Sequence, residues 1–359
     1  MKKGIIISAL LIVALIAFIA FQLLSQPDTE ASVEASATGE DYGISILDLF
    51  DTTTEISGYN TTEERFTEDV AFIKEELTRY NNLYDIYNEY EGINNVKTIN
   101  DNAGITPVKV DSELIDLIKY GKEMYYETDG KLNIAMGSVL SIWHTYREQG
   151  LENPDAATLP TEEELAAASE HTNIEDIIID EEAGTVYLAD TEMSLDVGGI
   201  AKGYAVQAVA TAAKAHGIDH VLLNVGGNIC AIGSKTEDKN FKIGIQNPDL
   251  ESDEAYIETV EIGDGGCVVS SGDYQRYYEV DGTRYCHIIN PDTLFPSTEF
   301  AQVSILASDS GMADAFSTAL FNMTLEDGQQ FIESHEGVEA MWVLKDGTFV
   351  YSEGFPSTN

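Results

Sequence analysis

Apolar side chains recur at the three-to-four-residue spacing of an amphipathic helix in several stretches of the chain. In 62–82, Phe66, Val70, Ile73 and Leu77 fall on one side of such a helix. Residues 144–173 are rich in Glu, Pro and Ala and predict a surface excursion followed by a short helix. Further helices are predicted over 111–127, which Asp111 can cap, over the Ala-rich 201–216 and from about 311 to 323.

Shorter apolar and β-branched runs predict strands between these helices. Residues 44–59 alternate apolar and polar side chains and predict a strand that opens the folded domain. The Asp281-Gly282 pair lies between two runs, 277–280 and 284–288, and predicts a hairpin. Further strands are predicted at 177–180, 185–188, 193–197, 221–225, 241–245, 256–262, 267–270, 303–306, 340–344 and 348–351. Strands that pair mostly with near neighbours, with helices interspersed, indicate an α+β fold rather than a doubly wound sheet.

The N-terminal pattern differs from the rest of the chain. Lys2 and Lys3 precede an apolar run from Gly4 to Ala20 that continues almost to Ser25. About 20 apolar residues can cross the hydrocarbon core of a membrane as a helix, and the two lysines predict that the following domain is outside. The alternative is a signal peptide, because residues 31–37 are small enough to permit cleavage.

The predicted organisation is therefore a transmembrane anchor or signal peptide (1–24), a polar linker (25–43) and one large domain (44–355). The expected location is the extracytoplasmic face of the cell membrane, or outside the cell after cleavage. Composition adds a strong charge bias to this picture: 63 acidic against 19 basic residues give a net charge of −44. Such a field repels phosphate backbones, which excludes nucleic acid as a partner. Affinity for divalent cations is one reading of the charge, and a solubilising acidic surface explains most of it.

The first candidate site is the segment 196–203, with the sequence Asp-Val-Gly-Gly-Ile-Ala-Lys-Gly. Adjacent glycines between a predicted strand and a predicted helix let the backbone approach a ligand, and a helix start offers N–H groups to an anion. Lys202 adds a positive charge in a chain that has few. A tight turn without a ligand explains the spacing equally well.

A second glycine pair occurs in Asn224-Val225-Gly226-Gly227-Asn228, at the end of a predicted buried strand. Backbone without side chains there could support a ring or a phosphate, with the Asn amides as hydrogen-bonding partners. A simple turn at the end of the strand is the alternative.

Asp314 and Thr318 stand four residues apart in a predicted helix, so both oxygens lie on one helix face. A carboxylate and a hydroxyl suit Mg²⁺, which keeps water ligands and binds phosphate oxygens. An Asp that caps its own helix and a Thr bonded to a backbone carbonyl would give the same spacing.

The last candidates are the segment Ser270-Ser271-Gly272-Asp273-Tyr274 and His287, in Tyr285-Cys286-His287-Ile288-Ile289. His287 could accept a proton from a hydroxyl or contact a cofactor. It follows aromatic and apolar residues, so a histidine packed in or beside the core is the alternative.

In this order, the segments resemble the ApbE family, the FAD:protein FMN transferases. The similarity runs from about Leu47 to Gly354. It is carried by Phe50-Asp51-Thr52, Tyr90 and Asn100, Gly130-Lys131-Leu132-Asn133, the 196–203 segment, 224–228, Ser271-Gly272-Asp273-Tyr274, 287–291 and 313–318. The resemblance implies an ApbE-like (T-fold-like) α+β fold with mixed or antiparallel sheets and packed helices.

The resemblance also implies roles for individual residues. Tyr90 would pack on the flavin, and Lys202 would lie near the pyrophosphate. The other implied FAD contacts are Lys131, Leu132, Asn133, Asp196, His287 and Ile288. The implied Mg²⁺ ligands, with Mn²⁺ as an alternative ion, are the carbonyl of Gly199, Asp314 and Thr318. Two positions depart from the family pattern: Asn133 and Asn290 stand where members often have Asp.

The implied reaction is transfer of FMN from FAD to a Ser or Thr hydroxyl of an exported acceptor protein, with release of AMP. His287 or Asp273 would assist removal of the hydroxyl proton, and the sequence does not decide between them. Two alternatives remain: an FAD pyrophosphatase that uses water, and an extracellular protein that holds FAD without chemistry.

Overall fold

The computed structural model describes residues 34–35 and 41–357. The predicted membrane segment, residues 1–24, lies outside these ranges and stays a prediction, as does most of the linker. Within the described ranges, no helix is both long and apolar enough to cross a membrane.

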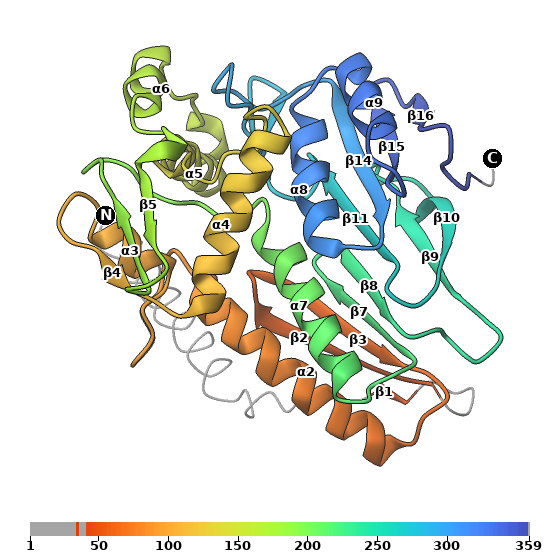
Figure 1. Cartoon of the computed structure of the whole chain (residues 1–359). Coiled ribbons are helices and arrows are strands. Elements are labelled where there is room, and N and C mark those ends of the chain that lie inside the picture. The colour runs from red at the N-terminus through yellow and green to blue at the C-terminus, as the bar shows by residue number, and fades with distance from the viewer. Residues whose placement is uncertain (1–33, 36–40, 358–359) are drawn as a thin grey trace, which may run out of the picture.

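A nine-stranded sheet forms the centre of the molecule (Figure 1). Each strand is antiparallel to its neighbours, so the α+β expectation with antiparallel sheets is confirmed. The strands in spatial order are β1 (Glu34–Ala35), β2 (Tyr42–Leu49), β3 (Thr52–Gly58), β7 (Val221–Val225), β8 (Asn228–Ile232), β11 (Cys267–Gly272), β14 (Phe300–Ala307), β15 (Glu339–Leu344) and β16 (Phe349–Tyr351).

The single opening strand predicted over 44–59 is wrong: this stretch lies in two strands, β2 and β3, which form a hairpin. The chain turns at Phe50 and Asp51, whose φ angles are 54° and 52°. Left-handed backbone at two successive non-glycine residues is uncommon. The N–H of Phe50 donates to the side chain of Asn81 at 2.8 Å. A partner 31 residues away therefore helps hold a turn that the local pattern does not predict.

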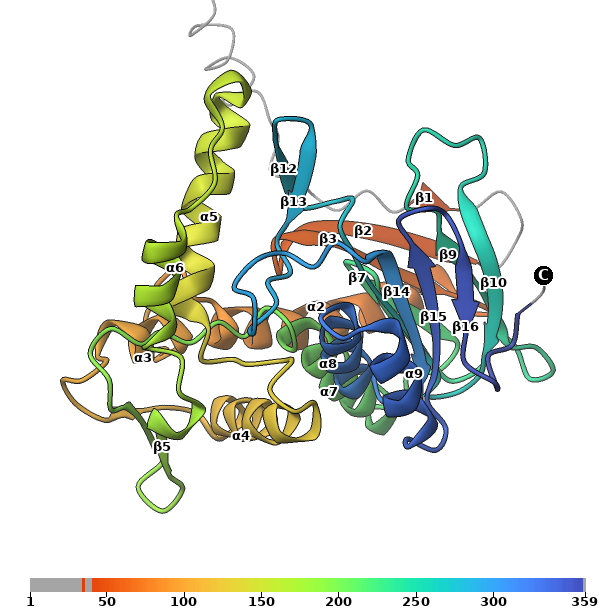
Figure 2. The ribbon, with the colours of Figure 1, turned by 90° about the horizontal axis from the view of Figure 1, so that it is seen from above.

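Helices cover one face of this sheet (Figures 1 and 2). They are α2 (Glu63–Tyr84), α7 (Ala201–Ala215), α8 (Ser310–Phe321) and α9 (Leu325–Glu333). The predicted helices over 62–82, 201–216 and 311–323 are confirmed, and α9 was not predicted. The apolar stripe of α2, including Phe66 and Ile73, is buried in the main core together with the inward side chains of the strands.

A hairpin covers part of the opposite face of the sheet. It consists of β9 (Phe241–Gln246) and β10 (Tyr256–Ile262), which pair only with each other among the described strands. Phe241, Ile243 and Ile245 pack with Val268 and Met341 in a second, smaller core on this outer face.

The remaining elements form a lobe beside the sheet. They are α3 (Val96–Asp101), α4 (Ser112–Glu127), α5 (Gly137–Glu152), α6 (Glu162–Ser169), the three-stranded sheet of β4 (Val108–Lys109), β6 (Thr185–Leu188) and β5 (Ile177–Asp180), and the hairpin of β12 (Tyr277–Val280) and β13 (Thr283–Cys286). The hairpin predicted around Asp281-Gly282, the strands predicted at 177–180 and 185–188, and the helix predicted over 111–127 are confirmed. Asp111 holds the N-cap position of α4 without a side-chain hydrogen bond.

Two predictions fail in this lobe. Residues 193–197 are not a strand, and 144–152 belong to α5 instead of a surface excursion. Trp143 of α5 is buried against Tyr285 and Phe295 in a third core. A helix that packs one side on a hairpin and leaves another side to a cavity has only a weak apolar stripe, so its pattern resembled that of a loop.

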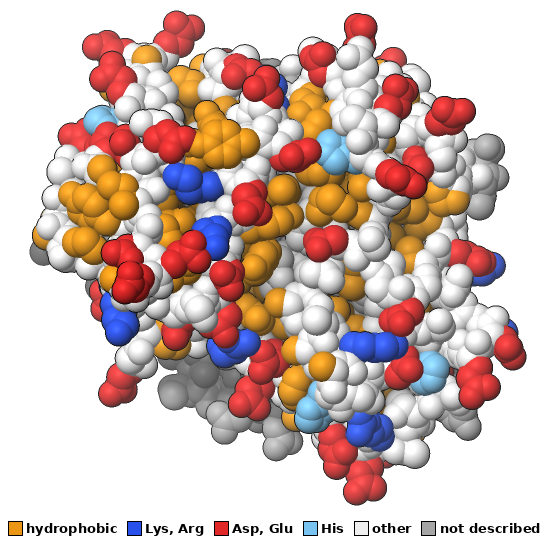
Figure 3. Space-filling view, in the orientation of Figure 1, with side chains coloured by type: hydrophobic (Ala, Val, Ile, Leu, Met, Phe, Trp, Pro, Cys, Tyr) orange, Lys and Arg blue, Asp and Glu red, His pale blue; other side chains and the backbone are white. Residues whose placement is uncertain are grey.

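On the face shown in Figure 3, the acidic side chains are scattered rather than gathered at one place. Among the described residues, no group of three or more His, Cys, Asp or Glu side chains could hold a metal ion. Most of the negative charge is therefore surface charge.

Candidate active site

A cavity of about 1260 Å³ opens between the lobe, the ends of the central strands and the β9–β10 hairpin. Its wall includes residues from α5, the segment before α7, α8, the segment after β11 and β9. Typical small-molecule pockets measure roughly 300–1,000 Å³. This cavity therefore has room for a dinucleotide and for part of a second reactant.

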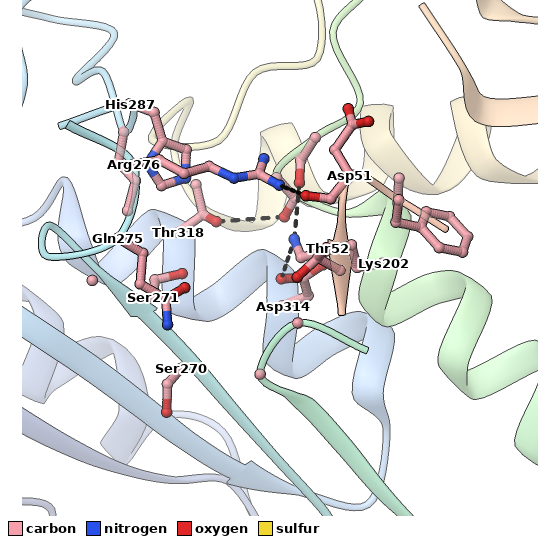
Figure 4. A pocket seen from close by; sticks show the side chains of 18 of the residues that line it. Asp51, Thr52, Lys202, Ser270, Ser271, Gln275, Arg276, His287, Asp314 and Thr318 are labelled. Atoms are coloured by element: carbon pink, nitrogen blue, oxygen red, sulfur yellow. Dashed lines mark hydrogen bonds and ion pairs between the residues drawn. The ribbon is translucent and has the colours of Figure 1, made fainter. Parts of the chain in front are cut away.

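Four of the predicted residues meet at one end of the cavity (Figure 4). The hydroxyl of Thr318 donates to the carbonyl oxygen of Gly199 at 3.5 Å. The ammonium of Lys202 lies 3.6 Å from Oδ1 of Asp314 and donates to the carbonyl of Gly198 at 3.3 Å. The four-residue spacing in α8 does place both oxygens on the side that faces the 196–203 segment. Stretches more than one hundred residues apart in sequence thus converge.

Asp314 also completes the start of α7. The N-cap residue of α7 is Ile200, whose side chain cannot accept a hydrogen bond. Oδ2 of Asp314 accepts the N–H of Gly203 at 2.8 Å and so satisfies one of the unpaired donors of the first turn. Only 3% of Asp314 is exposed. Burial raises the pKa of its carboxyl, against the opposing effects of Lys202 and the Gly203 N–H.

Gly203 makes this contact possible because α7 and α8 approach closely there. A Cβ at Gly203 would lie 2.3 Å from the carbonyl oxygen of Ser310 and 2.4 Å from Cβ of Asp314.

We expect Gly203→Ala to lower the free energy of unfolding by about 2 kcal/mol and to reduce activity, since the helices must separate. Gly43→Ala is the control, because its nearest neighbour would be 3.9 Å away. Equal thermal melts of both variants and the wild type would contradict this packing argument.

His287 also lines the cavity, and its ring is exposed to that space. Its backbone N–H donates to the carbonyl of Arg276 at 3.0 Å. The surrounding walls reduce hydration, and the charges of Arg276, Lys202 and Arg147 repel a further proton. Together they lower the pKa of His287 to about 3. The ring is therefore neutral at pH 7, with one ring nitrogen unprotonated.

The other proposed base, Asp273, lies elsewhere. It is 4% exposed, does not belong to the described cavity wall and forms an ion pair with Lys345. Its neighbours Gly272 and Tyr274 do line the cavity, which is why sequence adjacency was misleading. Side chains alternate in direction along extended backbone. The structure thus gives no support to Asp273 as a base.

The remaining predicted FAD contacts are distributed around the cavity. Lys131, Leu132, Asn133, Asp196 and Ile288 all line it. Lys131 forms an ion pair with Asp292. The Asn133 amide donates to the carbonyl of Thr172 and its oxygen accepts the N–H of Ala135, so this side chain joins its own turn to the segment at Thr172. The N–H of Gly198 donates to Asp196 at 2.8 Å.

Tyr90 is the predicted contact that the structure does not place in the described wall of the cavity. Its hydroxyl donates to Asp85 at 2.7 Å. Tyr87, three residues earlier, lines the cavity, is 52% exposed and lies 5.5 Å from the ring of His144 on α5. A loop with two tyrosines close together gives no periodic signal that separates them.

Two arginines at the cavity were not predicted. Arg276 donates to the carbonyl of Asp51 at 2.7 Å, and Figure 4 shows it beside His287. Arg147 extends from α5, and burial together with Arg276 lowers its pKa. Only 19 lysines and arginines occur in the chain, and five of them, Lys131, Arg147, Lys202, Lys242 and Arg276, line this cavity. An isolated arginine in a hairpin or an unrecognised helix carries no local pattern that marks it as a ligand.

Comparison with known proteins agrees with the earlier resemblance. The model of the ApbE family matches residues 50–342. An FAD:protein FMN transferase of Klebsiella pneumoniae is 31% identical over 277 residues, which cover 77% of this chain and 82% of that protein. The enzyme of the same name from Treponema pallidum is 32% identical over 264 residues, covering 69% and 70%.

Solved structures show the same fold. An ApbE protein of Thermotoga maritima superposes with a TM-score of 0.76 at 29% identity, covering 88% of this chain and 98% of that one. A substituted form of the flavin transferase ApbE from Vibrio cholerae gives a TM-score of 0.72 at 25% identity, covering 88% and 99%.

Proposed function

The chain belongs to the ApbE family and is a flavin transferase, and from this premise we propose that it moves FMN from FAD to a Ser or Thr hydroxyl of an exported protein in a Mg²⁺-dependent reaction. The observation that carries the proposal is the meeting of Asp314 and Thr318 with Gly199 and Lys202 at the cavity end, beside His287. Hard oxygen donors and a cation at one place suit a pyrophosphate and its metal ion.

These three oxygen donors suit Mg²⁺ better than a metal ion that takes all of its ligands from the protein. One buried carboxylate, one hydroxyl and one carbonyl leave positions for water and phosphate oxygens, which Mg²⁺ retains and borrows. Asp314, Thr318 and the Gly199 carbonyl would hold the ion, and Mn²⁺ would fit the same donors. Bound there, the ion would supply charge neutralisation to the pyrophosphate.

The protein groups account for orientation and proton movement. Lys202, Arg276 and Arg147 would hold the FAD phosphates in a chain that is otherwise strongly acidic. Neutral His287 would accept the proton of the attacking hydroxyl. As the new oxygen–phosphorus bond to FMN forms, the phosphoanhydride bond breaks and AMP leaves with the bonding electron pair. No electron is transferred to or from the flavin.

Lys131, Leu132, Asp196 and Ile288 are proposed to contact FAD, together with the backbone of Asn133. We propose that Tyr87, in place of Tyr90, packs on the flavin ring.

Loss of one stacking partner costs roughly 1–3 kcal/mol. Tyr87→Ala should therefore raise the Kd for FAD about tenfold, measured by quenching of flavin fluorescence. Tyr90→Ala is the control; a larger effect of Tyr90→Ala than of Tyr87→Ala would reverse the assignment.

The predicted N-terminal segment, residues 1–24, bears on where the reaction takes place. If residues 1–24 anchor the chain, the active site lies on the outer face of the membrane and the acceptor is exported. Cleavage of the segment would give a secreted enzyme with the same requirement. Either arrangement leaves the domain's chemistry unchanged.

The decisive experiment mixes the purified protein with FAD, Mg²⁺ and candidate exported proteins. We expect one acceptor to gain the mass of one FMN covalently, with release of an equal amount of AMP. Rapid AMP release without any acceptor would favour the pyrophosphatase alternative. Retained FAD with neither AMP release nor labelling would favour a flavin-binding protein and overturn the proposal.

A further inference from the structure

The cavity continues beyond the catalytic end along an open strand edge. Successive residues of β9, Lys242 to Gln246, all line it. β9 pairs with β10 on one side, and within the described part of the chain no strand pairs with its other side. The backbone groups that point away from β10 therefore face the cavity without a strand partner, and such an edge can accept another strand.

The outer face of the central sheet forms the floor beneath this edge. Ser57, Leu222 and Ile229 line the cavity there, together with Glu55 and Asn224. Leu222 lies opposite Ser57 in β3, and Asn224 lies opposite Ile229 in β8, so the floor is a regular strand surface. We call the space between this floor and the edge of β9 the β9 trough. Figure 2 shows that the hairpin stands on the side of the sheet opposite to α7 and α8.

The trough leads directly to the catalytic end. The side chain of Gln275 donates to Gln246, the last residue of β9, at 3.4 Å. The next residue, Arg276, accepts the backbone N–H of His287. In Figure 4, Gln275 lies close to Ser271, on the same side of the view as Arg276 and His287. A chain that follows β9 toward Gln246 therefore arrives beside the predicted base.

We infer that the acceptor binds the β9 trough as an extended segment that adds a third strand to the β9–β10 hairpin. This inference rests on the proposed function, which requires a protein hydroxyl to reach His287. Backbone hydrogen bonds to β9 would provide affinity, and alternate side chains would contact the floor. The floor offers apolar contacts at Leu222 and Ile229 and polar ones at Ser57 and Asn224. A segment with alternating small polar and apolar side chains is the matching partner.

The test uses the acceptor found by FMN labelling and synthetic peptides that span its modified residue. An added strand donates N–H groups to β9 from every second residue only. N-methylation at one set of alternate positions should raise the KM of the peptide about tenfold per site, and methylation at the other set should change it less than threefold. FAD binding should be the same throughout.

Hydrogen exchange gives a second, independent measurement. The same peptide, with Ala in place of the reactive Ser or Thr, should slow exchange of amides within 242–246 and leave 277–286 unchanged. Labelling of the unmodified peptide by the wild-type enzyme shows that the proposed function holds. If that labelling occurs while both methylation sets behave alike and β9 gains no protection, the strand-addition inference is overturned and the transferase assignment survives.

Discussion

Replacement of Asp314 by Asn is expected to reduce kcat/KM for FMN transfer about 10³-fold while the protein stays folded. Asn keeps an oxygen that can accept the N–H of Gly203, so the cap of α7 remains. It removes the negative charge next to Lys202 and the proposed metal ligand. The free energy of unfolding should change by no more than about 1 kcal/mol, because a neutral hydrogen bond replaces a charged one. Mass-spectrometric labelling and thermal melts measure the two effects separately.

Asp314→Ala should add a stability loss of about 1–2 kcal/mol, since the N–H of Gly203 then loses its acceptor. Asp309→Asn is the matched control on the same helix. Asp309 caps α8 through the N–H of Met312 at 2.8 Å, and Asn serves equally well at that position. Near wild-type labelling by Asp314→Asn at low Mg²⁺ would show that the carboxylate is structural and would remove it from the proposed site.

The individual residues of this site were predictable because most of them follow a short-range rule. A separation of four residues fixes one helix face, and a glycine pair before a helix fixes an exposed turn. Asp314, Thr318, Gly199 and Lys202 each satisfied one such rule. The family resemblance then implied that the segments around residues 199, 202 and 314–318 form one site. No local pattern alone could have paired residue 199 with residue 318.

The fold predictions that failed have the opposite cause, since each depends on a long-range contact. The turn at Phe50 is bonded to Asn81, and α5 is defined by packing on β12–β13 rather than by its own stripe. Asp273 is adjacent to residues that line the cavity and Tyr90 is three residues from Tyr87, which lines it, but their own side chains pair with Lys345 and Asp85. Hydrogen-bond and ion-pair partners of this kind decide in which direction a loop side chain points. Arg147 and Arg276 were missed because charge concentrates at the site only after folding.

The second large effect concerns His287. We expect His287→Gln to lower kcat for FMN transfer by about 10²–10³, the usual contribution of a positioned base, with little change in the KM for FAD. The wild-type profile of kcat/KM should show no acid limb near pH 6.5. The pKa of His287 in the free enzyme is lowered to about 3, so the ring remains a neutral base as the pH falls from 8 to 5. A His with an ordinary pKa would lose activity across that range.

An acid limb from Asp314 can still appear, because burial raises the pKa of that carboxyl and its protonation removes the charge at the proposed metal site. Such a limb should persist in the residual activity of His287→Gln, whereas a limb caused by His287 would vanish. His171→Gln provides the control, since His171 pairs with Asp190 away from the cavity wall. Activity of His287→Gln within tenfold of the wild type, or an acid limb at pH 6.5 that only this variant loses, would contradict the assignment. The attacking hydroxyl would then lose its proton to another group, and the cations around His287 would serve FAD binding alone.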